Sequence, residues 1–270
     1  MTKITQENYY DKQLSKKFMS FSLFKNFDTN PARALADLNG EYPWFDNDTA
    51  LLVGNYVHSY FESDEAHQKF ISENPEMFST RGTSKGKLKS EFQQAQKMIE
   101  RFEKEPMFVN SLSMATKRET IITGTIDGIK WKGKTDALDV DNAVFYDFKT
   151  VKSLVDDGSV WDNERHERVP FIISRRYDEQ MAVYAELLKQ TYGYEFTPVI
   201  WAVSKDKEPL VKPYMLTPKT LDMALDRVIS KQQDIVDWRD GVEKSPLIND
   251  GSNYYNYAHR IESYDDYGLI

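Results

Sequence analysis

Cysteine is absent from the 270 residues of this chain. Iron–sulfur clusters and zinc–thiolate fingers need cysteine ligands, and disulfides need pairs of cysteines, so the sequence excludes all three. Apolar runs long enough to cross a bilayer are also absent, and residues 1–7 lack the apolar segment of a secretory signal. We therefore expect a soluble, cytoplasmic protein without membrane contact.

The chain also lacks an excess of basic residues. It contains 35 Lys and Arg but 43 Asp and Glu, which gives a formal net charge of −8. Proteins that bind duplex nucleic acid are usually basic. An acidic chain can still bind a polyanion where metal ions supply positive charge and its own cations lie along one track. Residues 81–89 and the pair Arg175 and Arg176 are the two candidate basic clusters, and the pair is better placed to hold phosphate. The alternative for each cluster is a solvated surface.

Acidic residues gather in the stretch 133–150, between two β-prone runs. Residues 124–138 are rich in Thr, Ile and Trp, residues 139–142 have turn composition, and residues 144–150 resume a strand pattern, which together predict a hairpin. Side chains alternate along a strand, so Asp147 and Lys149 share a face, and Asp136 can lie beside Asp147. Two carboxylates can hold Mg²⁺, and an ammonium can orient or deprotonate water, as phosphodiester hydrolysis requires.

The stretch 133–150 has two other interpretations. Charges that alternate along an exposed strand face are usually solvated, and Asp-x-Lys is common by chance. A calcium-binding loop of the EF-hand type fails on spacing, because Leu138 and Asp141 occupy its third and sixth positions.

Helical periodicity flanks this region and indicates an α/β protein. Residues 91–102 and 178–190 carry apolar residues at core-facing intervals, and 218–238 is a long amphipathic pattern. The β-prone segment 197–203 follows the second helix and completes a βαβ crossover onto the same sheet. The predicted apolar positions of the first two helices are Phe92, Ala95, Ile99 and Phe102, then Met181, Tyr184, Ala185 and Leu188.

An ordered set of motifs resembles the RecB-like branch of the PD-(D/E)xK nuclease superfamily. Residues 19–34 resemble its opening helix, Gly54-x-x-x-His58 its Gly-x-x-x-His motif, and Gln180-x-x-x-Tyr184 its Gln-x-x-x-Tyr motif. Asp136 and the triplet from Asp147 to Lys149 lie between the last two. Relatives with an iron–sulfur cluster place a cysteine before the proline of the opening helix, where this chain has Asn30. The spacing is most similar to the RecE (exonuclease VIII) type.

The resemblance implies roles residue by residue. His58, Asp136, Asp147 and the carbonyl of Phe148 would be metal ligands for Mg²⁺, with Mn²⁺ substituting. Lys149 would position the attacking water, and the remaining motif residues, Gln180 and Tyr184, would complete the catalytic set. Arg175 and Arg176 would bind DNA. His58 and Tyr184 could each instead be ordinary core residues. Glu62 and Glu119 are possible extra carboxylates near the site, but acids at such positions are commonplace, so the predicted set leaves them out.

The implied fold is α/β, a restriction-endonuclease-like core with a central mixed β-sheet flanked by helices and helical elaborations at both ends. We expect one nuclease domain over residues 1–250, followed by a Tyr-rich acidic tail over residues 251–270. Within the domain we expect a helical N-terminal region over residues 1–110, a catalytic core over residues 111–205 and a helical C-terminal region over residues 206–250. The tail could stack on bases or dock on its own domain. Residues 151–176 would be an active-site border or a surface loop.

The implied function is a Mg²⁺-dependent exonuclease that degrades linear double-stranded DNA from its ends, 5′-to-3′, and leaves single-stranded overhangs for phage-type recombination. The resemblance further implies a ring-shaped homo-oligomer, a RecT-type single-strand annealing partner, and a phage or prophage origin in a bacterial host. A structure- or sequence-specific endonuclease of the same fold, or a non-catalytic DNA-binding subunit, remain alternatives.

Overall fold

The computed structural model describes residues 3–45, 48–162 and 166–260 and divides into two compact units. Unit 1 takes its described residues from Met1–Asp46, Thr125–Lys132 and Arg227–Ile270, and unit 2 from Asn47–Gly124 and Gly133–Asp226. The regions predicted from the sequence follow chain order, whereas each unit is assembled from separated stretches. Strands β1 and β2 and helix α10, whose bounds follow, run from one unit into the other.

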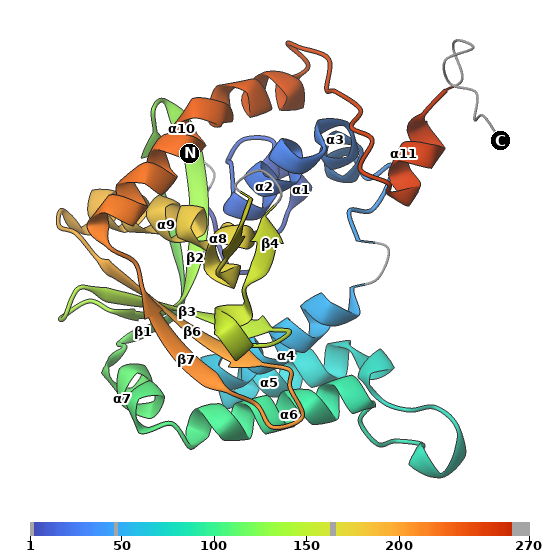
Figure 1. Cartoon of the computed structure of the whole chain (residues 1–270), viewed down its shortest axis with the longest axis vertical. Coiled ribbons are helices and arrows are strands. Elements are labelled where there is room, and N and C mark those ends of the chain that lie inside the picture. The colour runs from blue at the N-terminus through green and yellow to red at the C-terminus, as the bar shows by residue number, and fades with distance from the viewer. Residues whose placement is uncertain (1–2, 46–47, 163–165, 261–270) are drawn as a thin grey trace. The chain divides into compact units, whose positions relative to one another are not determined.

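A five-stranded mixed sheet carries the acidic stretch, and this confirms the predicted fold class (Figure 1). Its strand order is β1-β2-β3-β6-β7, with β2–β3 and β6–β7 antiparallel and β3–β6 parallel. The strands are β1 (Lys117–Ile126), β2 (Ile129–Asp139), β3 (Val144–Val151), β6 (Thr197–Ser204) and β7 (Val211–Met215). The parallel β3–β6 pair confirms the predicted βαβ crossover.

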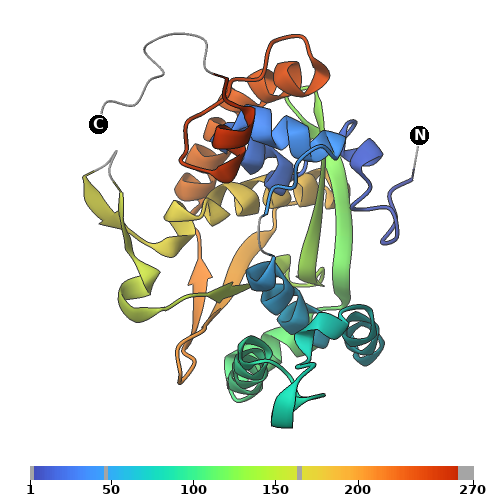
Figure 2. The same cartoon turned by 90° about the vertical axis from the view of Figure 1, so that its right-hand side faces the viewer.

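Helices of unit 2 lie on both faces of this sheet (Figures 1 and 2). One face carries α4 (Thr49–Glu62), α5 (Asp64–Glu73), α6 (Ser90–Glu103) and α7 (Pro106–Met114), and the other carries α9 (Tyr177–Tyr192). The remaining elements of unit 2 are η1 (Pro75–Met77), η2 (Gly82–Ser84), η3 (Val155–Gly158), the antiparallel pair β4 (Val160–Asp162) and β5 (Glu167–Val169), α8 (Phe171–Ser174), and the start of α10 (Pro218–Asp240).

An aromatic core fills the space between α4–α7 and the sheet. Phe102 and Phe108 stack with ring centroids 4.3 Å apart, and Phe148 lies 5.3 Å from Phe108. Tyr146 and Phe148 belong to this core while Asp147 does not, so the predicted alternation along β3 is confirmed. The four predicted apolar positions of α6 are all buried.

Residues 124–138 form two strands rather than the single strand of the sequence interpretation. Asp127 and Gly128 lie between β1 and β2 with φ of 44° and 82°. Positive φ at both central residues is the type I′ geometry of a two-residue hairpin turn, for which Asp-Gly is a favoured sequence. The next turn was predicted correctly. There the Asp139 carboxylate accepts hydrogen bonds from the backbone and side-chain nitrogens of Asn142, at 3.0 and 2.8 Å.

Unit 1 is helical around a buried tryptophan. It contains α1 (Lys12–Ser15), α2 (Phe21–Thr29), α3 (Pro31–Asn39), α11 (Asn253–Ala258) and the later part of α10. The Trp131 ring lies 5.7 Å from that of Phe24, and its Nε1 donates to Gln232 Oε1 at 2.9 Å. Tyr254 is buried and donates to the carbonyl of Ala32 at 3.1 Å. This portion of the tail therefore docks on its own unit, whereas the tail residues 261–270 lie outside the described residues.

None of the helices in the described portion of the chain combines the length and apolar composition that crossing a bilayer requires.

Candidate active site

The backbone ladder between β2 and β3 ends at the pair Ala137 and Tyr146. One residue further along β2, the Asp136 carboxylate accepts a hydrogen bond from the backbone N–H of Phe148. If the two strands continued to pair, a backbone carbonyl of β2 would accept this hydrogen bond. A side chain thus replaces a carbonyl, and the carboxylate is held at the point where the two strands stop pairing. The prediction that Asp136 lies against the Asp147–Lys149 segment is confirmed.

Helix α4 brings His58 to the same carboxylate. His58 Nδ1 lies 3.1 Å from Asp136 Oδ1, and the His58 side chain keeps 27% of its exposure. Gly54 lies one turn earlier on the same helix face, and a Cβ at this position would lie 3.6 Å from Thr150 Oγ1 of β3. The Gly-x-x-x-His spacing therefore describes one helix face that meets the strand carrying Lys149. His58 is therefore more than a packed core side chain. It belongs to a group of metal-ligating side chains, His58, Glu119 and Asp136, which we call the acidic cluster.

Glu119 joins this cluster, although the sequence interpretation left it out. Ligand atoms of His58, Glu119 and Asp136 all lie within 4.8 Å of one another. Glu119 is buried in β1 at φ 45°, a left-handed conformation that costs a non-glycine residue about 1–3 kcal/mol. Such local distortions turn a side chain out of the strand alternation and are frequent next to active sites. An ion pair with Lys134 fixes the carboxylate.

Asp147 faces a second set of partners. Its Oδ1 accepts from Lys149 Nζ at 3.0 Å and from Gln180 Nε2 at 3.4 Å, while Oδ2 lies 2.8 Å from the same Nζ. Gln180 Nε2 also donates to Tyr184 Oη at 3.2 Å. The predicted Gln-x-x-x-Tyr face of α9 therefore points at the aspartate of the Asp-x-Lys triplet. Tyr184 is a buried residue and a member of this chain of contacts at once.

The predicted residues thus meet as two adjoining groups, joined through Phe148. Asp136, His58 and Glu119 form one group, and Asp147 with its partners on β3 and α9 forms the other. The structure brings Asp136, Asp147, Lys149, His58, Gln180 and Tyr184 together and adds Glu119 and Lys134.

Burial and mutual charge shift the titration of these groups. Burial raises the pKa of Asp147 to about 6, against the opposing pull of Lys149. Burial also raises the pKa of Glu119, and the negative charge of Asp136 adds to it. For His58, burial is outweighed by the charge and hydrogen bond of Asp136, so its pKa rises to about 9. For Lys149, burial is likewise outweighed by Asp147, and its pKa lies above the usual value.

The pKa values of Tyr184 and Asp136 are shifted in opposite directions. Burial raises the pKa of Tyr184 to about 12, which keeps its phenol neutral. Burial of Asp136 is outweighed by His58, so the pKa of this carboxyl lies below its usual value. Perturbed titratable groups that converge in this way are typical of functional sites.

Arg175 and Arg176, the predicted DNA-binding pair, immediately precede α9. Arg176 has φ 60° and donates from Nε and Nη2 to Glu179 Oε2, at 2.9 and 2.6 Å. Its guanidinium is therefore held by a buried carboxylate of the next helical turn. Arg175 is exposed. DNA contact by the pair stays a prediction.

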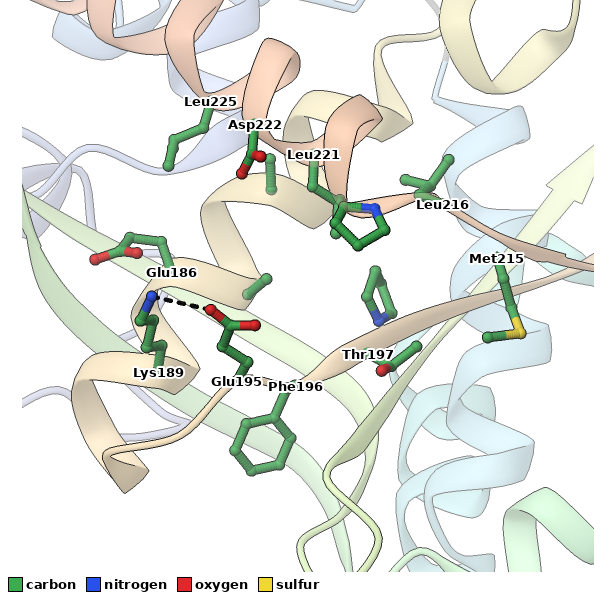
Figure 3. Close-up of a pocket in the computed structure, with 14 residues that line it drawn as sticks. Glu186, Lys189, Glu195, Phe196, Thr197, Met215, Leu216, Leu221, Asp222 and Leu225 are labelled. Carbon is green, nitrogen blue, oxygen red and sulfur yellow. Dashed lines mark hydrogen bonds and ion pairs between the residues drawn. The ribbon is translucent and has the colours of Figure 1, made fainter.

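A cavity of about 340 Å³ lies on another face of α9 (Figure 3). Leu221 and Leu225 of α10 and Phe196 give it mostly apolar walls, and a Lys189–Glu195 ion pair spans 3.2 Å at its edge. Its lining includes none of the acidic-cluster residues. The cavity and the acidic cluster are therefore separate features of unit 2.

The donor set of the acidic cluster fits a divalent cation. Carboxylate oxygens are the ligands that Mg²⁺ prefers, and an imidazole nitrogen beside them also suits Mn²⁺. His58, Glu119 and Asp136 supply one ligand atom each at mutually compatible distances. Asp147 lies on the adjoining strand and supplies a further carboxylate. The residues present therefore fit the metal that the motif resemblance implies.

Comparison with known proteins gives two matches that carry an argument. The family described as "PDDEXK-like domain of unknown function (DUF3799)" matches residues 20–254. A crystal structure from Eubacterium rectale, described as a "putative exonuclease", is 29% identical with a TM-score of 0.86, over 97% of this chain and 96% of that chain. The structure of SSO0001 has a TM-score of 0.30 and 14% identity over 75% of this chain and 98% of that chain, which is too low to use. No curated protein matches the chain.

Proposed function

This chain belongs to the family of PDDEXK-like domains and is a nuclease of the PD-(D/E)xK type, and we propose that it is a metal-dependent exonuclease acting on linear double-stranded DNA. The observation that carries the proposal is the convergence of Asp136, Asp147 and Lys149 from paired strands with His58 and Glu119. The exonuclease mode is supported by the description of the Eubacterium rectale protein, which matches nearly the whole chain.

His58, Glu119, Asp136 and Asp147 would hold Mg²⁺, with Mn²⁺ substituting. When bound, the cation supplies positive charge beside the scissile phosphate and makes a coordinated water more acidic. The carbonyl of Phe148 would be a further ligand, as the motif resemblance implies.

The chain's own groups position the reactants. Lys149, held 2.8 Å from Asp147, presents an ammonium that orients the attacking water and stabilises charge on the phosphate. Gln180 holds Asp147 in place, and the neutral phenol of Tyr184 in turn accepts from Gln180. Arg175 would contact DNA beside this site.

Finer features of the proposal rest on the resemblance to RecE-type exonucleases. We propose 5′-to-3′ degradation that leaves single-stranded overhangs for phage-type recombination, with a RecT-type annealing protein as partner. A ring-shaped homo-oligomer on double-stranded DNA ends completes this proposal. Duplexes labelled at one 5′ or one 3′ end test the polarity, and light scattering of the purified protein tests the oligomer.

Digestion of linear duplex and covalently closed circular DNA tests the main proposal. The protein is incubated with each substrate and Mg²⁺, with EDTA and the Lys149→Ala variant as controls. Loss of linear DNA alone is the expected result, because an exonuclease needs an end. Cutting of circles would assign an endonuclease of the same fold, and cleavage that persists in Lys149→Ala would remove the proposed site.

A further inference from the structure

A basic loop, residues 78–89, connects η1 to α6 and has no role in the acidic cluster. It contains four cations, Arg81, Lys85, Lys87 and Lys89, and no acid. The whole chain carries a net charge of −8, so this short segment is of opposite sign to the protein. The loop is the teal segment at the lower right of Figure 1.

The backbone of the basic loop is ordered by its own hydrogen bonds. Ser79 N donates to the carbonyl of Lys87, and Gly86 N donates to the carbonyl of Ser79, both at 2.8 Å. Phe78 and Leu88 form an isolated β-bridge, and both pack against the core cluster of unit 2. The loop is therefore a hairpin-like projection with an apolar base, and its cations are presented on a preformed backbone.

The four cations of the loop are exposed, and three of them are unpaired. Within the described ranges, the side chains of Arg81, Lys85 and Lys87 form no hydrogen bond and no ion pair, and all three are exposed. Lys89 is also exposed and neighbours Glu91. Most cations on the adjoining helices behave differently, although Lys97 of α6 is also exposed and, in the described part of the chain, has no ion pair. Lys69, Arg101 and Lys104 each pair with a glutamate of their own helix or its end.

We propose that the basic loop binds the phosphate backbone of nucleic acid at a place distinct from the acidic cluster. The inference rests on the proposed action on linear double-stranded DNA, which supplies a polyanionic substrate. Unpaired cations release counterions from a nucleic-acid backbone, and this gain requires no base recognition. A concentrated patch of four charges is what an otherwise acidic protein needs to retain a long duplex while the acidic cluster acts on one bond. Contacts of this kind are independent of sequence.

A charge-matched pair of variants tests the loop. The loop variant is Arg81→Gln with Lys85→Gln, Lys87→Gln and Lys89→Gln. The control variant changes four exposed lysines elsewhere to Gln, namely Lys16, Lys17, Lys219 and Lys244. Binding of a 40-base-pair duplex is measured by fluorescence anisotropy in EDTA across a salt series, so that no cleavage occurs. Cleavage of bis(p-nitrophenyl) phosphate with Mn²⁺ follows the chemistry without a polymer backbone.

The loop variant should bind the duplex about tenfold or more weakly at 50 mM salt, and its salt dependence should flatten by about 1 to 4 in slope. Its rate on bis(p-nitrophenyl) phosphate should equal that of the wild type. Equal binding by the loop variant and the wild type, or an equal loss in the control variant, would overturn the inference. Weakened binding to phosphatidylserine vesicles with duplex binding intact would assign a membrane contact instead. A wild type that binds duplex through the loop but never cleaves DNA contradicts the proposed exonuclease function and leaves the loop inference standing.

Discussion

A buried lysine in unit 1 and a partly buried lysine in unit 2 show what distinguishes a structural charge from a functional one. Lys132 in unit 1 is 1% exposed and donates to the carbonyl of Tyr9 at 2.6 Å and to Ser15 Oγ at 3.3 Å. Lys149 in unit 2 lies against Asp147, and Asp136 also acts on its charge. The first lysine donates to neutral oxygens and feels the charge of Asp11 only as a minor influence, whereas the second lies directly against a carboxylate.

Their titration follows from these partners. Burial lowers the pKa of Lys132, since neutral oxygens only partly replace water around its charge. At Lys149 the carboxylates outweigh the same effect and the pKa rises. Burial of a polar group is therefore a weak sign of a site, because a fold satisfies such groups routinely. Convergence of several like charges is the stronger sign, because packing alone gives no reason for it.

The largest expected effect is that of Lys149→Met, which should lower the cleavage rate per folded molecule by about 10²- to 10³-fold. The variant keeps much of the side-chain volume but removes the ammonium that faces Asp147 and the reacting phosphate. Cleavage of linear duplex is measured beside circular dichroism, which gives the folded fraction. A rate within threefold of wild type would place Lys149 with Lys132 as a structural residue.

Glu119→Gln should weaken Mn²⁺ binding by about 10- to 100-fold, because it replaces a charged ligand with a neutral one. Isothermal titration calorimetry measures the affinity. The matched control is Glu62→Gln, an exposed acid on the same helix as His58, whose replacement should leave Mn²⁺ affinity unchanged. Equal affinities in both variants would mean that the left-handed backbone at Glu119 does not serve the cluster.

Lys132→Met should lower the free energy of unfolding by about 1–3 kcal/mol, because the Tyr9 carbonyl and Ser15 lose their donor. Urea denaturation measures the loss. The cleavage rate per folded molecule should stay at the wild-type value, the reverse of Lys149→Met. A large loss of activity with unchanged stability would show that the contrast between the two lysines is wrong.

Gly133→Ala should lower the free energy of unfolding by about 1–3 kcal/mol through overpacking, as urea denaturation would measure. A Cβ at this position would lie 2.7 Å from Cε1 of Tyr184 and 3.2 Å from Cγ1 of Ile122. The displaced Tyr184 would also disturb Gln180, so cleavage should fall.

Gly54→Ala is the control for Gly133→Ala, because its Cβ would meet only Thr150, at 3.6 Å, inside a helix where alanine is favoured. It should be neutral or stabilise the fold by up to about 1 kcal/mol. Equal destabilisation by the two substitutions would mean that Tyr184 is free to move.

Sequence reasoning succeeded where the signal is local. The turn at Asp139–Asn142, the strand that carries Asp147 and the helical stripe from Phe92 to Phe102 each follow from patterns within one element. The hairpin turn at Asp127 and Gly128 was missed although its Asp-Gly signal is present, because the flanking β-prone residues masked the break. Strand β7 was not predicted, because its sequence contains Pro213 and has only a weak strand pattern.

The same reasoning named Glu119 only as a possible extra carboxylate and could not assign it to the site. Its position in the cluster depends on a left-handed φ, which glutamate rarely adopts. No sequence pattern predicts that conformation. The engagement of Arg176 by Glu179 is a second example, since the spacing of three residues is also compatible with a guanidinium that faces solvent. Assembly of unit 1 from three separated stretches is a tertiary property, and composition along the chain does not reveal it.

Asp136 has an architectural task that bears on how its chemistry can be studied. Its carboxylate ends the β2–β3 ladder by accepting the Phe148 N–H, besides facing His58. Alanine scanning would mislead at this residue, because a methyl group leaves a strand amide without an acceptor and lets the two strand ends separate. Asparagine retains a carbonyl oxygen of the same reach while removing the charge. Asp136→Asn is thus the substitution that separates the residue's scaffolding role from its role as an anion.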